Sequence, residues 1–119
     1  MTQNLFNDLS RAFITDCPPI HAVAVSHDEK VFVVAEMHKS YYPRMPKGNR
    51  NRGYISTDIC ELVDKGVYCT LKTIKSYRYP TDAQITFSGM ARENGWAYAN
   101  NRKELNRILK KIFVDNNVA

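Results

Sequence analysis

The first part of the chain shows two hydrophobic periods in succession, that of a helix and then that of β-strands. In residues 3–15, apolar side chains recur three and four positions apart, which predicts a helix with one buried stripe. Thr2 is placed to cap the start of this helix, and Pro18 and Pro19 end the segment. The expected stripe consists of Leu5, Phe6, Leu9, Ala12 and Phe13.

Residues 20–26 and 31–38 are rich in valine and phenylalanine and predict a β-hairpin that turns at 27–30. With an even-numbered turn the expected cross-strand pairs are Val25 with Phe32, Val23 with Val34 and His21 with Glu36. A wholly apolar face would then be formed by Ile20, Ala22, Ala24, Val33, Ala35 and Met37. The other face is also largely apolar but ends in His21, Glu36 and His38. Because both faces are suited to burial, the hairpin is expected at the centre of its sheet.

A second helix is predicted at 56–65, after the hairpin. Asp58 can cap it, and Glu61 three positions later completes a capping-box pattern. Gly66 suits the left-handed position that ends a helix, and residues 67–75 follow as a strand. The buried stripe of this helix would be Ile59, Leu62 and Val63.

Residues 81–99 allow two interpretations. The preferred one has strands at 84–88 and 96–99, because β-branched and aromatic residues favour a sheet and Gly89 is a poor helix former. The alternative is a helix at 82–93.

Residues 102–114 give the clearest helical period in the chain. Asn101 is placed to cap this helix, with Glu104 at its third position. The apolar stripe consists of Leu105, Ile108, Leu109, Ile112 and Phe113.

Together these elements predict one α+β domain that spans residues 1–119, a length typical of single domains. We expect an antiparallel sheet of about four strands, flanked by an N-terminal and a C-terminal helix. A long basic loop would follow the first hairpin.

That loop, residues 38–54, is the main candidate for function. It contains two prolines and two glycines, no acidic residue, and far more residues than most connections in a compact domain. Its basic residues are Lys39, Arg44, Lys47, Arg50 and Arg52, and its tyrosines are Tyr41, Tyr42 and Tyr54. A second basic and aromatic cluster follows at 72–79 and includes Lys75, Tyr77 and Arg78.

The charge of the chain is positive and unevenly placed. The net charge is +5 at pH 7 and the sequence pI is about 9.2, which favours anionic partners. Residues 1–36 hold two basic against five acidic residues, whereas the remainder holds fifteen against seven. Such asymmetry is typical of a surface that faces a polyanion.

The cysteine count bears on the cellular compartment. Three cysteines, Cys17, Cys60 and Cys69, form no Cys-x-x-Cys pair, which favours free thiols in a reducing compartment. The start of the chain does not resemble a signal peptide, and no apolar run approaches the length of a membrane span. We therefore expect a cytoplasmic protein.

Arginine and lysine bind phosphate oxygens, and tyrosine rings stack on unpaired bases. The two clusters therefore predict a small non-enzymatic protein that binds nucleic acid, with single strands or RNA favoured. The alternative is an interaction or inhibitor module that docks its basic loop on an acidic partner protein. A solvated loop and a lysine-guarded edge strand are the interpretations without a ligand. The oligomeric state stays open, and a homodimer is compatible with the pattern.

Catalytic and metal chemistry have weaker support in the sequence. His21 and Glu36 are the only acid–base pair that the expected register builds, and a satisfied structural pair explains them as well. The histidines and cysteines do not have the spacing of a zinc site. We therefore expect no enzyme activity, no metal and no cofactor.

Overall fold

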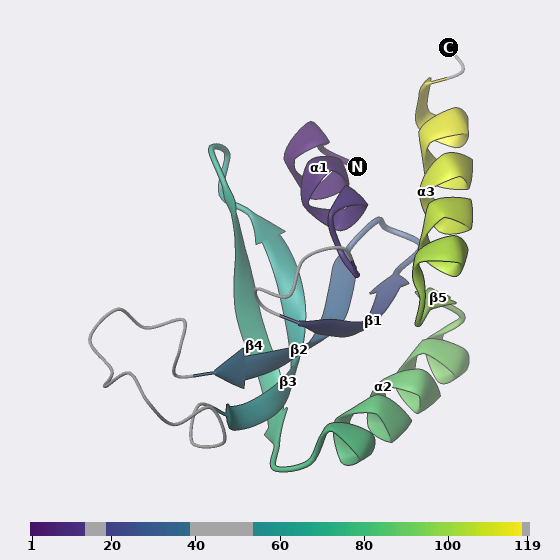
Figure 1. Cartoon of the computed structure of the whole chain (residues 1–119). Helices are drawn as coiled ribbons and strands as arrows, with labels where there is room; N and C mark the ends of the chain where they lie inside the picture. The colour runs from purple at the N-terminus through teal and green to yellow at the C-terminus, as the bar shows by residue number, and fades with distance from the viewer. Residues whose placement is uncertain (14–18, 39–53, 118–119) are drawn as a thin grey trace.

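The computed structural model describes residues 1–13, 19–38 and 54–117, and within the last helix it describes side chains through residue 112. In this part of the chain an antiparallel sheet of five strands is accompanied by three helices (Figure 1). The elements are α1 (Gln3–Ser10), β1 (Ile20–Val25), β2 (Val31–His38), β3 (Tyr54–Asp64), β4 (Cys69–Tyr77), α2 (Pro80–Asn94), β5 (Ala97–Ala99) and α3 (Arg102–Asn117). The strand order is β4-β3-β2-β1-β5.

The helices cover both faces of the sheet. On one face, Leu9 of α1 and Leu105 of α3 pack against apolar residues of β1 and β2. On the other face, the helix α2 buries Phe87 against the same two strands and β3. We call these two clusters the α1/α3-side core and the α2-side core. The hairpin β1–β2 is central in the sheet and buried on both faces, as the sequence predicts.

Both terminal helices are confirmed, with different bounds. Thr2 caps α1, since its hydroxyl accepts a hydrogen bond from the backbone N–H of Leu5 at 3.3 Å. The described helix ends at Ser10, earlier than the expected residue 15. Asn101 caps α3 in the same way, accepting from the N–H of Glu104 at 2.9 Å.

The predicted register of the hairpin is wrong by one residue near the turn. Val25 pairs with Val31, not Phe32, because the turn has five residues, with Glu29 in the left-handed region at φ 63°. Ser26 stabilises this turn, since its hydroxyl accepts from the N–H of Lys30 at 2.9 Å. The expected apolar face is therefore divided: Ala22 and Ala24 lie in the α2-side core, whereas Val33 and Ala35 lie in the α1/α3-side core.

The predicted helix at 56–65 is wrong, because this segment belongs to β3. It is paired along its length with β2 on one side and β4 on the other. Asp58 is not a helix cap but a buried side chain, which accepts hydrogen bonds from Ser56 Oγ at 2.6 Å and Thr73 Oγ1 at 3.0 Å. Gly66, at φ 96°, lies in the β3–β4 turn.

The preferred interpretation of residues 81–99 is also wrong in its first half. A strand at 84–88 is not formed; the alternative helix is present as α2, followed by the short strand β5. Pro80 begins α2, and Gly95 ends it in the left-handed conformation at φ 67°. Its buried residues are Ala83, Phe87 and Ala91, four positions apart. The strand expected at 67–75 is confirmed as β4, at the edge of the sheet.

The predicted α+β class with an antiparallel sheet and flanking helices is thus confirmed, with five strands where about four were expected. The long basic loop falls on residues 39–53, outside the described residues. No helix of the described segments is long and apolar enough to cross a membrane.

Candidate functional site

A row of polar side chains crosses four neighbouring strands at one end of the sheet. Glu36 of β2 pairs directly with Thr57 of β3, and Thr57 pairs with Tyr77 of β4. On the other side, His21 of β1 places its Nε2 atom 3.4 Å from Oε2 of Glu36. We call His21, Glu36, Thr57 and Tyr77 the polar row.

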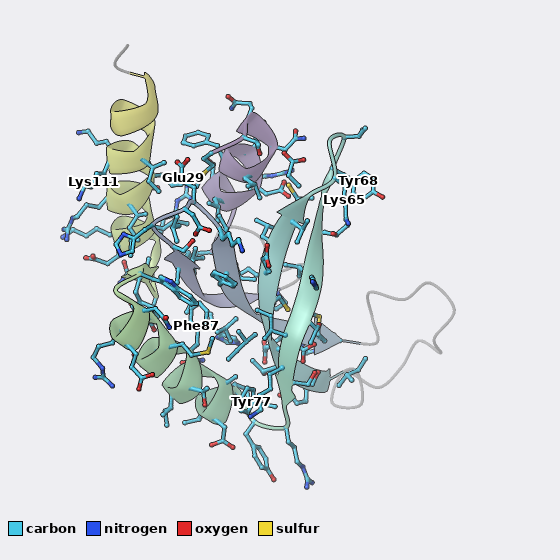
Figure 2. All side chains as sticks on the ribbon, turned by 180° about the vertical axis from the view of Figure 1, so that it is seen from behind. Glu29, Lys65, Tyr68, Tyr77, Phe87 and Lys111 are labelled. Carbon is cyan, nitrogen blue, oxygen red and sulfur yellow. The ribbon has the colours of Figure 1, made fainter. Side chains whose placement is uncertain are left out.

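The polar row borders the α2-side core. Glu36 and Thr57 lie two positions from Val34 and Ile59, so strand alternation places them on the same face as these buried residues. Tyr77 packs against the same core, and Figure 2 shows it near the start of α2, with Phe87 between that helix and the sheet. The apolar face under α2 therefore changes to a polar one at this end of the sheet.

A second histidine joins Glu36 on its strand. His38 Nε2 lies 3.8 Å from Oε2 of Glu36, so the carboxylate is placed between two imidazoles. The ring of His38 meets the ring of Tyr54 edge-on, with centroids 5.6 Å apart. The side chains of His21, Glu36 and His38 are 30%, 22% and 24% exposed, but the Nε2 atoms of both histidines are buried.

Irregular strand pairing produces this arrangement. The register shifts between Ile20 and Ala22, and again between Met37 and His38. In the rest of the hairpin the observed pairing differs from the predicted register by one residue. The first register shift nevertheless brings His21 beside Glu36. The predicted contact between these two side chains is therefore found, but in a different register. Bulges often re-aim side chains beside functional sites.

Two polar atoms of the row are buried without hydrogen bonds. Among the described residues, neither His21 Nε2 nor the hydroxyl of Tyr77 has a hydrogen-bond partner. Most buried polar atoms in proteins have such a partner, so each exception requires an explanation. For His21 the distance to Glu36 is that of an ion pair, although the geometry is not that of a hydrogen bond.

The second basic cluster lies beside the start of β3. The Tyr54 hydroxyl donates to the carbonyl oxygen of Arg78 at 2.8 Å, so Thr57 Oγ1, also at 2.8 Å, donates to Tyr54. Lys75 Nζ lies 5.2 Å from the ring centre of Tyr77. The structure thus brings together four of the predicted site residues: Tyr54, Lys75, Tyr77 and Arg78. The others lie outside the described residues: Lys39, Tyr41, Tyr42, Arg44, Lys47, Arg50 and Arg52.

Thr57 is the member of the polar row that the sequence did not indicate, because residues 56–65 were predicted to be helical. A strand would have placed Thr57 beside Glu36 in the sheet. The available signal was the period of two in the β-branched residues Ile55, Thr57, Ile59 and Val63.

A separate polar cluster on the opposite face of β3 has a structural role. Thr73 Oγ1 donates to Asp58 and lies 3.8 Å from Cys60 Sγ. Burial raises the pKa of the Cys60 thiol to about 11, so the thiol is neutral and unreactive at pH 7. No group of three histidine, cysteine or acidic residues among the described residues is arranged to hold a metal ion.

Comparison of the chain with protein-family models, curated proteins and solved structures finds no match.

Proposed function

We propose that the protein binds single-stranded nucleic acid, with RNA favoured, at the end of the sheet where β2 ends and β3 begins. The observation that carries the proposal is the 2.8 Å hydrogen bond from the Tyr54 hydroxyl to the Arg78 carbonyl. It joins the residue that follows the basic loop in sequence to the second basic cluster. The start of β3 and the cluster at the end of β4 therefore lie side by side in the fold.

The chemistry of the β4 end supports this proposal. Lys75 and Arg78 are exposed, and Arg78 lies over the ring of Tyr79, 5.4 Å from its centre. Tyr79 is itself 56% exposed, so one side of its ring is open for a base to stack. Stacking on an aromatic side chain contributes about 1–3 kcal/mol per base. No acidic residue occurs between Asp64 and Asp82 in the sequence, so the charges of this segment are all positive.

The loop residues would supply most of the phosphate contacts. Arg and Lys at four or five positions would give a slope of about −3 in a plot of log affinity against log salt for a single strand. Phosphate contacts do not read the bases, so we expect the protein to bind oligonucleotides of different sequence with similar affinity.

The test is fluorescence anisotropy with a 5′-fluorescein RNA of mixed sequence and the DNA of the same sequence, over a range of NaCl concentrations. We expect the double variant Lys75→Ala/Arg78→Ala to weaken binding at least several-fold and to make the salt slope shallower by about 1.4, which is two contacts on a single strand. The matched control is Arg92→Ala/Lys103→Ala, which removes two exposed charges elsewhere.

Equal weakening by the two double variants would mean that only net charge matters, and the proposed surface would be wrong. Absence of binding at low salt would refute the function itself. Salt-sensitive capture of an acidic protein, without oligonucleotide binding, would favour the protein-docking alternative.

A further inference from the structure

We propose that the outer edge of β4 docks an acidic, extended segment of a partner protein, which joins the sheet as a further strand. This inference does not rest on the proposed binding of RNA. Among the described strands, β4 pairs with β3 alone, so its other edge forms the border of the sheet. This border lies on the side of the sheet away from α3 (Figure 1). Extended segments bind to such edges through main-chain hydrogen bonds, and their side chains supply the specificity.

The edge of β4 is long and exposed. The strand has nine residues, Cys69–Tyr77, and at about 3.3 Å per residue they present roughly 30 Å of backbone. Residues 72–76 are exposed one after another, so neither face of the strand is covered there by another part of the described chain. Proteins usually keep such edges short or cover them, because unpaired N–H and C=O groups pair readily with another strand. This edge can accept a strand without a change in the fold.

An apolar side chain lies in the middle of the edge. The pairing of β3 with β4 shifts between Ile59 and Cys60, which leaves Ile74 as an extra residue in β4. The side chain of Ile74 is 50% exposed. A strand that only avoids association needs charged side chains at its edge. The exposed isoleucine adds an apolar contact that protection of the edge does not require.

The two lysines of β4 lie on the same face of the sheet. Lys72 pairs with Glu61 and Lys75 with Ile59, and these two residues of β3 are two positions apart. Because Ile59 lies in the α2-side core, both lysines are on the face that α2 covers elsewhere. Both are exposed, and Lys75 has no acidic residue opposite it on β3. Opposite charges stabilise a cross-strand pair, so a strand with acidic side chains on this face fits the edge.

The same charges disfavour a second copy of the chain as the occupant. Two antiparallel β4 strands would bring the lysines of both copies together, and like charges destabilise a strand pair. No acidic residue occurs between Asp64 and Asp82 to balance them, and the whole chain has a net charge of +5. The edge is therefore protected against pairing with itself while it stays open to an acidic strand.

The test uses two fluorescein-labelled peptides as long as β4, one alternating valine with glutamate and the other alternating valine with lysine. In anisotropy measurements at low salt, the glutamate peptide should bind and the lysine peptide should not. Hydrogen–deuterium exchange, followed by mass spectrometry, should show slower exchange in residues 69–77 when the glutamate peptide is added. Slower exchange there means that backbone amides of the edge have become hydrogen-bonded.

N-methylated peptides separate backbone pairing from charge. The glutamate peptide is prepared in two forms, methylated at the valine or at the glutamate amides, so that each form has one edge blocked. At least one form should fail to bind, because a methylated amide cannot donate to β4. Binding of both forms as tightly as the parent peptide would show that only charge matters, and would overturn the inference.

The double variant Lys72→Gln/Lys75→Gln tests the charged face. It should weaken binding of the glutamate peptide about 2–30-fold, the usual contribution of two exposed ion pairs. The matched control is Lys110→Gln/Lys111→Gln on α3, which removes two exposed charges elsewhere and should change the affinity less than about twofold. Equal weakening by the two double variants overturns the inference. If the β4 variant fails to fold, the N-methylated peptides decide.

Other results would also overturn the inference. These are no binding of the glutamate peptide at low salt, and slower exchange only outside residues 69–77. Protection of these residues that rises with protein concentration, without any peptide, would assign the edge to a second copy. Protection by RNA of mixed sequence but not by the glutamate peptide would assign it to nucleic acid. Because RNA and peptide are assayed separately, peptide binding without RNA binding refutes the proposed function alone.

Discussion

Replacing Tyr54 by phenylalanine removes one hydroxyl group that holds the start of β3 to the end of β4. That hydroxyl donates to the Arg78 carbonyl and accepts from Thr57 Oγ1, each at 2.8 Å. A protein hydrogen bond contributes a net stability of about 0.5–1.5 kcal/mol. The bond to Arg78 is exposed and belongs at the low end, whereas Thr57 is fully buried and would lose a partner. We therefore expect a loss of about 1.5 kcal/mol in the free energy of unfolding.

The assay is urea denaturation followed by circular dichroism. With a typical dependence of about 1–3 kcal/mol per molar urea, the midpoint should fall by roughly 0.5–1.5 M. The matched control is Tyr79→Phe, because Tyr79 is the exposed tyrosine next to the same cluster. Its removal of a hydroxyl should change stability by less than about 0.5 kcal/mol.

A double-mutant cycle with Thr57→Val separates the hydrogen bond from other effects. Removing both hydroxyls leaves no unpaired buried donor, so the double variant should lose less stability than the two single variants together. A coupling below about 0.3 kcal/mol would show that the two side chains do not interact. The hydrogen bond between Tyr54 and Thr57 would then be absent.

Three further predictions concern other parts of the fold. Gly95→Ala at the end of α2 should lower the stability of the fold by about 1–2 kcal/mol, because an alanine resists the left-handed conformation at φ 67°. Gly89→Ala inside α2 should raise the stability by about 0.5–1 kcal/mol, since the added methyl group meets no atom within 4 Å. Thermal melting of both variants checks these opposite signs, and a change of the same sign in both would contradict the assignment of the helix end. Phe87→Ala should cost about 3–5 kcal/mol, because the ring is fully buried under α2, and a loss below about 1 kcal/mol in urea denaturation would show that the ring is not packed there. Burial raises the pKa of the Cys60 thiol from 9.0 to about 11, so the folded state keeps this proton to a higher pH than the unfolded state. The resulting contribution to the free energy of unfolding is fully present below about pH 9 and is lost as the pH rises through 11. Iodoacetamide labelling at pH 8, measured for the Cys60 peptide by mass spectrometry, should be much slower in the folded protein than in urea, because burial raises the thiol pKa and restricts access. Equal rates would contradict the burial of this thiol.

The sequence predicts elements well where one period dominates. The stripe of α3 and its cap at Asn101 are visible at helical spacing, and α1 begins at Thr2 as expected. β1 and β2 are visible because valine and phenylalanine favour a sheet and the segment between them is polar.

β3 could not be identified in this way because its burial does not alternate. The four residues from Thr57 to Cys60 are all buried, on two faces that are both covered, so burial does not alternate and the period of two is visible only in the β-branched residues. Asp58 and Glu61 imitated a capping box, whereas Asp58 in fact accepts hydrogen bonds within the sheet. Pairing with two neighbouring strands overrode the local preference for a helix.

The candidate site was only partly predictable for a related reason. The proximity of His21 and Glu36 was expected from the register of the β1–β2 hairpin. The actual contact depends on a bulge that no local sequence pattern predicts. The link from Tyr54 to Arg78 joins residues 24 positions apart and depends on β3 being a strand. Contacts that require two correct elements are lost when either element is predicted wrongly.

Among the described residues, three cover the outer edge of β1, since Val23 to Val25 pair with Ala97 to Ala99 of β5. During synthesis this edge stays open until some seventy further residues have left the ribosome. A premature stop or a proteolytic cut before Ala97 would leave an apolar strand with an unpaired backbone, which is a template for association between chains. Truncation from the C-terminal side should therefore produce insoluble protein long before it reaches the residues of the polar row.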